Sequence, residues 1–268
     1  MILENGKTRC SLNPMGAYLE ELYIDGKSII RKSPDRHVTH GGAAVLFPFG
    51  NRIRNADYFY GGLEYHLPQN DGKNSIHGLV RSMLFNYISG KDYIEFYTYF
   101  RSKSYPGIAG ISVRYEIQEN EFRTLFTVKS LSRTIPVEIG FHPYFTVNSE
   151  YSIDYTGTAM ELEYKDEYFP DGNYFTVNLK HTDMNRLKLD NAFLIESDIL
   201  LSDENHRVLI KRKNMPFAVI YNGEYAGENA VAIEPMTGAP DVYHSEIGLV
   251  NLEKGKIFQC SYSISLLQ

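Results

Sequence analysis

The sequence contains no tryptophan and only two cysteines, Cys10 and Cys260, among its 268 residues. Two cysteines near opposite ends of a chain cannot form a framework of several disulfides, and no Cys-x-x-Cys spacing offers a metal or redox site. The two thiols could pair if the ends of the chain met in one sheet. The favoured expectation is two small buried free thiols.

Long apolar segments are also missing. The longest uninterrupted apolar run, residues 43–49, has seven residues and includes Pro48, whereas a membrane-spanning helix needs about 20. The first residues, Met1 to Asn5, do not combine a basic region with an apolar stretch as a secretory signal would. We therefore expect a cytoplasmic protein without a membrane partner.

An excess of positive charge is absent as well. The chain has 27 Lys and Arg against 33 Asp and Glu, so its formal net charge is −6. Nucleic-acid partners usually require a basic surface, and none is expected here. With 43% hydrophobic and 22% charged residues, the composition is typical of a folded globular protein.

Motifs for several common chemistries are missing too. The sequence has no Gly-x-Gly-x-x-Gly, no phosphate-binding Gly-Lys-Ser/Thr loop and no Gly-x-Ser-x-Gly elbow. His37 and His40 are three residues apart near a Ser-, Pro- and Gly-rich loop, and we considered metal binding there the weaker alternative. We expect no metal and no cofactor.

What the sequence does contain is a repeated alternation of apolar and polar residues. Residues 111–117 alternate without interruption, and residues 93–100, 122–128 and 256–265 follow the same pattern. A period of two residues indicates half-buried β-strands. Turn-forming residues separate these segments at 89–92, 118–121 and 170–173.

No stretch of a dozen residues has convincing helical spacing, and we found neither an internal repeat nor a linker. The pattern predicts an all-β fold, a large antiparallel sandwich or barrel, in one domain over residues 1–268. The 21 tyrosines and 15 phenylalanines agree with this, because aromatic residues favour strands. They would also suit a surface on which sugar rings stack, although strand packing is the commoner reason.

Four segments combine polar side chains with apolar, Pro- or Gly-broken surroundings. They contain Asn51 with Arg52, His77 before a glycine, His142 before a proline, and Glu234 at the end of an apolar strand. Three of them have an ordinary structural explanation: a surface salt bridge for Arg52, a core histidine for His77, and a polar strand end for Glu234. A carboxylate drawn into a core is costly unless it is paired or functional.

Together these segments resemble the aldose 1-epimerases, or galactose mutarotase-like proteins. The matching motifs occur in the family's order along most of the chain: Asn51-Arg52-Ile53, His77-Gly78, Phe141-His142-Pro143-Tyr144-Phe145, Leu189-Asp190-Asn191-Ala192-Phe193 and Glu234-Pro235. The resemblance implies a β-sandwich of the supersandwich type. It also implies Glu234 as catalytic base, His142 as catalytic acid, and Arg52, His77 and Asp190 as sugar ligands supported by Asn51.

The chain departs from the galactose-specific members of this family. Leu79 follows His77-Gly78 where those enzymes usually have a second glycine, and their tryptophan is missing. Arg81, four residues after His77, is similar to the branch that acts on hexose 6-phosphates, in which arginines hold the phosphate. The resemblance therefore implies a mutarotase for an aldohexose, with a hexose 6-phosphate as the alternative substrate.

Exchange of the anomers requires removal of a proton from O1 and delivery of one to the ring oxygen O5. A base and an acid on opposite sides of the sugar can do both, each contributing roughly 10²–10⁴-fold. Glutamate, with an ordinary pKa of about 4.3, can accept the first proton. Histidine, at about 6.5, is only about one quarter protonated at pH 7, so the acid role requires a raised pKa. Asp190 is the candidate carboxylate that would raise the pKa of His142; alternatively, Asp190 binds a sugar hydroxyl and leaves that pKa unchanged.

Two other functions are alternatives to the epimerase. A glycoside hydrolase needs two carboxylates flanking a sugar, and Glu234 could pair with Asp190 or Glu138, but the segment around His142 would then have no role. A non-catalytic sugar-binding protein would need no acid and base pair. Both are less favoured than the epimerase, and the sequence does not indicate the oligomeric state.

Overall fold

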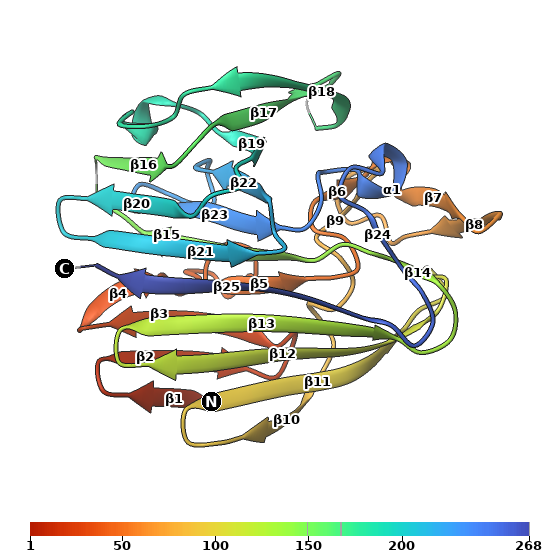
Figure 1. Ribbon diagram of the computed structural model, residues 1–268, viewed down its shortest axis with the longest axis horizontal. Helices are drawn as coiled ribbons and strands as arrows, with labels where there is room; N and C mark the ends of the chain where they lie inside the picture. The colour runs from red at the N-terminus through yellow and green to blue at the C-terminus, as the bar shows by residue number, and fades with distance from the viewer. Residues whose placement is uncertain (149, 167, 268) are drawn as a thin grey trace.

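The computed structural model describes residues 1–148, 150–166 and 168–267, and most of them belong to two large antiparallel sheets (Figure 1). The larger sheet has eleven strands. In spatial order they are β1 (Ile2–Asn5), β2 (Thr8–Asn13), β3 (Tyr18–Ile24), β4 (Lys27–Ile30), β15 (Gly140–Thr146), β23 (Ala230–Met236), β22 (Phe217–Tyr221), β19 (Asp190–Leu194), β17 (Ala159–Tyr164) and β18 (Pro170–Val177), with β5 (Ala43–Leu46) paired to β3 and β15.

The second sheet has eight strands. Their order is β10 (Asn86–Ser89), β11 (Tyr93–Arg101), β12 (Ile108–Gln118), β13 (Glu121–Ser130), β25 (Ile257–Leu266), β21 (Arg207–Lys213), β20 (Ile199–Asp203) and β16 (Tyr151–Tyr155). One large apolar cluster contains side chains from both sheets. The core therefore lies between two stacked layers, which is the sandwich that the sequence predicted.

Shorter elements sit beside the two sheets. Three two-stranded ladders join β14 (Ile135–Val137) to β24 (Val250–Leu252), β6 (Arg52–Ile53) to β9 (Ser75–Ile76), and β7 (Asp57–Tyr60) to β8 (Leu63–His66). The helical segments in the described part of the chain are short: α1 (Val242–Ser245), η1 (Arg54–Ala56) and η2 (Met184–Arg186). No described helix has the length and apolar character needed to cross a bilayer.

The alternating segments are confirmed as strands. In β12 buried and half-buried residues alternate from Ile108 to Ile117, because one face packs into the core and the other meets solvent. The predicted turns at 89–92 and 118–121 connect neighbouring strands of the second sheet, β10 to β11 and β12 to β13. Cys10 and Cys260 are both buried and free, as expected.

The turn predicted at 170–173 is wrong. Pro170 begins β18, which pairs with β17 through a register shift. The turn-forming residues act within the strand instead: the Asp171 side chain accepts a hydrogen bond from the backbone N–H of Asn173 at 2.9 Å, and Gly172 has a φ of 95°. Local turn chemistry thus bends a strand whose pairing is decided by distant residues.

The larger sheet has a second face, away from the core. On β15, Phe141 and Phe145 belong to the core between the sheets, whereas Tyr144 packs in a separate small cluster. Because successive side chains of a strand point to opposite faces, His142 lies on the same side as Tyr144, with their rings stacked at 4.9 Å. This outer face carries the candidate site.

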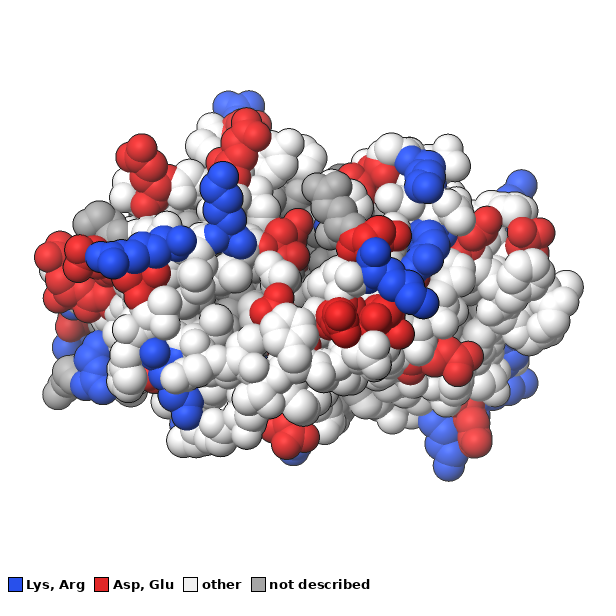
Figure 2. Space-filling model, turned by 90° about the horizontal axis from the view of Figure 1, so that it is seen from above, with Lys and Arg blue, Asp and Glu red and all other residues white. Residues whose placement is uncertain are grey.

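Charged side chains are mixed in sign over the surface that Figure 2 presents, the side of the molecule near β17 and β18. Acidic and basic groups lie among one another on this face, and no broad positive area is seen on it. Such a distribution agrees with the net charge of −6.

Candidate active site

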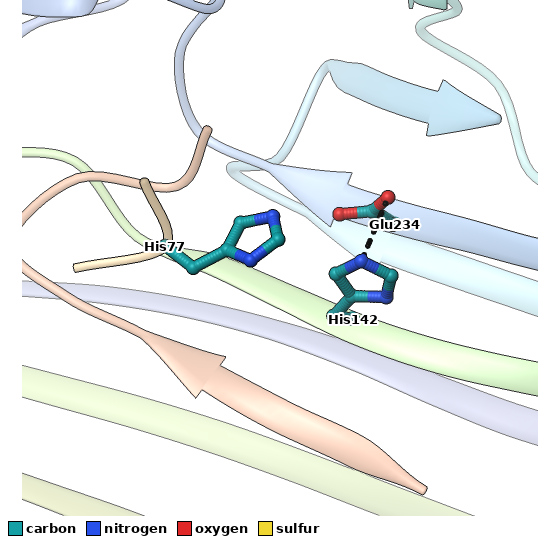
Figure 3. A group of neighbouring side chains, drawn as sticks. All are labelled: His77, His142 and Glu234. Carbon is teal, nitrogen blue, oxygen red and sulfur yellow. Dashed lines mark ion pairs between the residues drawn. The ribbon is translucent and has the colours of Figure 1, made fainter. Parts of the chain in front are cut away.

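The histidine and the glutamate singled out in the sequence face each other on neighbouring strands. Strands β15 and β23 are antiparallel, with Gly140 paired to Met236. Two residues further along each strand, this register brings His142 opposite Glu234. His142 Nε2 lies 3.4 Å from Glu234 Oε1, and the two side chains point toward each other (Figure 3). Both residues are buried, with exposures of 4% and 2%.

These two residues lie in a pocket of about 550 Å³, a volume within the usual range for small-molecule sites. All seven residues that the sequence nominated line it: Asn51, Arg52, His77, Arg81, His142, Asp190 and Glu234. They come from β6, β15, β19, β23 and the loops around β9. The fold therefore brings together side chains that are up to 183 residues apart, from position 51 to position 234.

Two loops that carry pocket residues are tied to each other by their backbones. The N–H of His77 donates to the carbonyl of Asn51 at 3.2 Å, and the N–H of Leu79 donates to the carbonyl of Phe47 at 2.7 Å. Gly78 has a φ of 66°, and a Cβ at this position would lie 2.4 Å from the Phe47 carbonyl oxygen. Only glycine permits this approach, which sets the position of the His77 ring.

Arg52 is held on several sides. Its Nε donates to Asp71 Oδ2 at 2.7 Å, and its Nη1 lies 3.7 Å from Asp190 Oδ2. The guanidinium also stacks over the ring of Tyr168, 4.2 Å from the ring centroid. A fixed guanidinium presents its remaining N–H groups in a defined direction, which suits recognition of hydroxyl oxygens.

A stack of three rings forms another wall of the pocket. The rings of His37 and His40 are 4.2 Å apart, and those of His40 and Tyr225 are 4.0 Å apart and nearly parallel. Asp35 Oδ2 lies 2.7 Å from His40 Nδ1, and the hydrogen bonds that Asp35 receives from His40 and the His37 backbone lower its pKa. Both histidines line the same pocket as His142 and Glu234.

Arg81 brings a positive charge to the pocket wall. Its Nη2 donates to the carbonyl of Ile76 at 3.2 Å, and desolvation lowers the pKa of its guanidinium. Within residues 1–148, 150–166 and 168–267, no carboxylate lies within ion-pair distance of Arg81. Unlike Arg52, which has Asp71 and Asp190, Arg81 is a half-buried cation with no counter-charge among the described residues.

Burial dominates the protonation of the central pair. Desolvation lowers the pKa of His142 to about 3 and raises the pKa of Glu234 well above its ordinary value. Both shifts favour the uncharged forms, because a charge is costly where water is excluded. The two pKa shifts therefore favour a state of the pair in which a single proton lies on Glu234 and the imidazole of His142 is neutral.

Two expectations about this pair are corrected. The pKa of His142 was expected to be raised by Asp190, but burial lowers it, and the negative charge of Asp190 instead raises the pKa of Glu234. The acid and base were expected on opposite sides of a sugar, but they are in contact at 3.4 Å. This is chemically workable, because O1 and O5 of an aldose are both bonded to C1.

Glu138, considered as a partner of Glu234 in a hydrolase, lies outside the pocket lining. It is 1% exposed, and it accepts a hydrogen bond from the N–H of Gly50 at 2.8 Å. Burial raises its pKa to about 8. Glu138 therefore supports the loop that leads to Asn51, and it cannot flank a sugar together with Glu234.

Sequence reasoning missed or gave no role to several residues that line the pocket. They are Thr39, Asn70, Asp71, Ile76, Tyr144, Tyr168, Tyr221 and Tyr225. Asp71 stands in an Asn-Asp-Gly turn, where an aspartate is ordinary. Tyr144 is the exception, because it stands two residues after His142 and strand alternation would have placed it on the same face.

One group of pocket residues has donor atoms suited to a metal ion. The imidazoles of His77 and His142 and the carboxylate of Glu234 offer one ligand atom each, and these atoms lie within 4.8 Å of one another. The rings of His77 and His142 are 5.0 Å apart, edge to face. His37 and His40 do not join this group.

Comparison with known proteins concerns the family and the fold. The profile of the family described as aldose 1-epimerase matches residues 1–265. The uncharacterized protein YihR of Escherichia coli K12 is 26% identical over 294 residues, covering 98% of this chain and 91% of YihR. A galactose mutarotase-like protein from Clostridium acetobutylicum superposes with a TM-score of 0.89 at 17% identity, covering 100% of this chain and 94% of its own. The galactose 1-epimerase of Lactobacillus acidophilus superposes with a TM-score of 0.81 at 19% identity, covering 99% and 93%.

Proposed function

Because the chain belongs to the aldose 1-epimerase family, we propose that it interconverts the α and β anomers of an aldohexose by acid and base catalysis in the pocket described above. The observation that carries the proposal is the buried contact between His142 and Glu234, 3.4 Å apart on adjacent strands. A sugar-binding protein gains nothing from such a pair, because burying two titratable groups together is costly.

The chemistry follows from the single proton of the pair. Opening the hemiacetal moves the O1 proton to a base and gives a proton to O5, and closing on the other face reverses both steps. Glu234 accepts from O1 in its ionised form while His142 donates to O5. Passage of the shared proton from Glu234 to His142, across their contact, prepares this state. Arg52 favours it, because its positive charge lowers the pKa of Glu234.

The remaining residues hold the sugar. Arg52, fixed by Asp71 and Asp190, has donors for hydroxyl oxygens, and Asp190 can accept from hydroxyl groups. His77 stands edge-on to His142 at 5.0 Å and is assigned to the sugar near the ring oxygen. Asn51 supports both, because its side-chain oxygen accepts from the N–H of Arg52 at 2.7 Å and its carbonyl accepts from the N–H of His77.

A hexose 6-phosphate is the second candidate substrate, and Arg81 is the observation that favours it. A half-buried guanidinium without a nearby carboxylate is suited to an anionic substituent, which would supply the missing counter-charge. A neutral hexose offers only hydroxyl groups to the same guanidinium. The two candidates therefore differ in which substrate has the larger kcat/KM, and not in the proton-transfer chemistry.

Polarimetry on freshly dissolved α-D-glucose, α-D-galactose and α-D-glucose 6-phosphate tests the proposal. We expect the protein to speed the approach to the unchanged anomeric equilibrium, and His142→Asn to lose most of the acceleration while remaining folded by circular dichroism. Tyr225→Phe serves as a matched control, because it changes the pocket without removing a proton-transfer group. Binding of these sugars with no acceleration would make the protein a sugar-binding member of the family, and release of reducing ends from an oligosaccharide would favour a hydrolase.

A further inference from the structure

We propose that His77, His142 and Glu234 also form a binding site for a divalent transition-metal ion, best suited to Zn²⁺, whose occupation excludes the sugar. Two imidazoles and one carboxylate, with one side open to solvent, are a known ligand set for zinc in proteins. The proposal concerns binding and exclusion, and the metal takes no part in the epimerase reaction.

Distances at the site support this assignment. With metal–nitrogen and metal–oxygen bonds of about 2.1 Å, two ligand atoms of a tetrahedral site lie about 3.4 Å apart. His142 Nε2 and Glu234 Oε1 are 3.4 Å apart. The ligand atom of His77 is no more than 4.8 Å from the others, so each of its distances to the other two ligand atoms has to shorten by at most about 1.4 Å, the difference between 4.8 and 3.4 Å. Rotation of an imidazole side chain covers such a distance.

The directions of the side chains are suitable as well. In Figure 3 the ring of His77, which comes from the loop after β9, faces the contact between His142 on β15 and Glu234 on β23. Glu234 Oε2 has no hydrogen-bond partner within the described residues, although the residue is only 2% exposed. A buried carboxylate oxygen without a partner is a costly feature that a bound cation would remove.

The surrounding charges permit a cation here. Asp71 and Asp190 contact Arg52 at 2.7 and 3.7 Å, which offsets the positive charge of that residue. Arg81 opposes a cation and reduces its affinity. Because His142 and Glu234 serve both ligands, a bound metal ion would occupy the two groups that move the protons, so metal and sugar would compete.

A titration of the intact protein, freed of metal by a chelator, with Co²⁺ tests the site without any need for activity. Tetrahedral Co²⁺ absorbs strongly in the visible region, so the spectrum reports both geometry and stoichiometry. We expect one equivalent to bind with a tetrahedral spectrum, and Zn²⁺ to displace it. His77→Asn should weaken Co²⁺ binding at least about 100-fold, because even the partners behind a metal ligand are worth about 10–100-fold.

Asparagine is chosen at position 77 because the backbone φ there is 63°, a conformation that asparagine tolerates better than most residues. The control is His66→Ala, since the His66 side chain is 74% exposed and should leave Co²⁺ affinity unchanged. Absence of Co²⁺ binding to the wild type would overturn the proposal. Co²⁺ binding by His77→Asn with the affinity of the wild type would overturn it too. So would a loss of Co²⁺ binding in His37→Ala but not in His77→Asn, because this result would assign the ion to Asp35, His37 and His40.

The predicted competition between the metal ion and the sugar rests on the proposed function. It is measured separately from the Co²⁺ titration without sugar. At a concentration of aldose that saturates turnover, the apparent Co²⁺ affinity should fall in proportion to the occupancy of the pocket by sugar. An unchanged affinity would overturn the claim of a shared site. If the protein turns over no aldose, the spectroscopic titration still decides whether the metal site exists, so the two proposals fail independently.

Discussion

Glu138→Gln should flatten the dependence of stability on pH. Glu138 is 1% exposed, and burial raises its pKa from 4.5 to about 8. At about 1.36 kcal/mol per pKa unit, this change corresponds to at most about 5 kcal/mol. Glutamine keeps an oxygen to accept the hydrogen bond that Gly50 donates at 2.8 Å, so the loop before Asn51 should retain its structure.

The sign follows from which state binds the proton. Between pH 4.5 and 8 the folded protein keeps the Glu138 proton, whereas the unfolded chain has lost it. The contribution of Glu138 to the free energy of unfolding is therefore fully present below pH 4.5, falls as the pH rises, and levels off above about 8. Glu138→Gln has no such proton, so the variant should gain stability relative to the wild type as the pH rises from 5 to 8.

Urea unfolding of both proteins at pH 5, 6.5 and 8 measures this difference. We expect the free energy of unfolding of Glu138→Gln minus that of the wild type to increase by several kcal/mol over this range. Glu253→Gln, at an exposed position, should show no comparable change. If Glu138→Gln and the wild type have the same pH slope, the carboxyl group does not carry the buried proton inferred here, and the reasoning is refuted.

Three further outcomes are expected. The kcat/KM for anomer exchange, corrected for the spontaneous rate, should be constant between pH 5 and 7. It should fall only as the pH approaches the pKa of His142, about 3. An inflection of the profile near pH 6.5 would contradict the sharing of one proton between His142 and Glu234. Gly78→Ala should lower the free energy of unfolding in urea by at least about 2 kcal/mol, because φ is 66° and the new Cβ would meet the Phe47 carbonyl; unchanged stability would refute this. Arg81→Gln should reduce kcat/KM for glucose 6-phosphate more than for glucose, and an equal effect on both would argue against an anion-binding role.

Local patterns in the sequence were sufficient for the all-β fold class, whereas the choice of a sandwich over a barrel came from the family resemblance. In residues 111–117 apolar and polar residues alternate because one face of β12 packs in the core and the other does not. This alternation can be read from neighbouring residues of the sequence alone. The error at 170–173 has the opposite origin. Proline, aspartate and glycine there form a local bend, but pairing of β18 with β17 depends on residues outside that segment.

The candidate site was predictable to a similar degree. Each of its main residues stands in an unusual local context, such as His142 before a proline, and all seven nominated residues line one pocket. The contacts between these residues, and their effects on pKa, were not predictable from the sequence. Contact of His142 with Glu234 depends on the register of two strands, and the ion pair of Arg52 with Asp71 depends on how two loops meet. The low pKa of His142 follows from burial, which no local pattern specifies.

Proton exchange spectroscopy of aldoses at anomeric equilibrium tests the central claim most directly. In a solution of glucose, galactose and glucose 6-phosphate, the account predicts protein-dependent exchange peaks between the α and β H1 signals of at least one sugar. These peaks should disappear with Glu234→Gln, which removes the proton acceptor but preserves the shape of the side chain. Exchange that persists at the wild-type rate in Glu234→Gln would contradict the assigned chemistry, and binding of the sugars without any exchange would contradict the proposed activity itself.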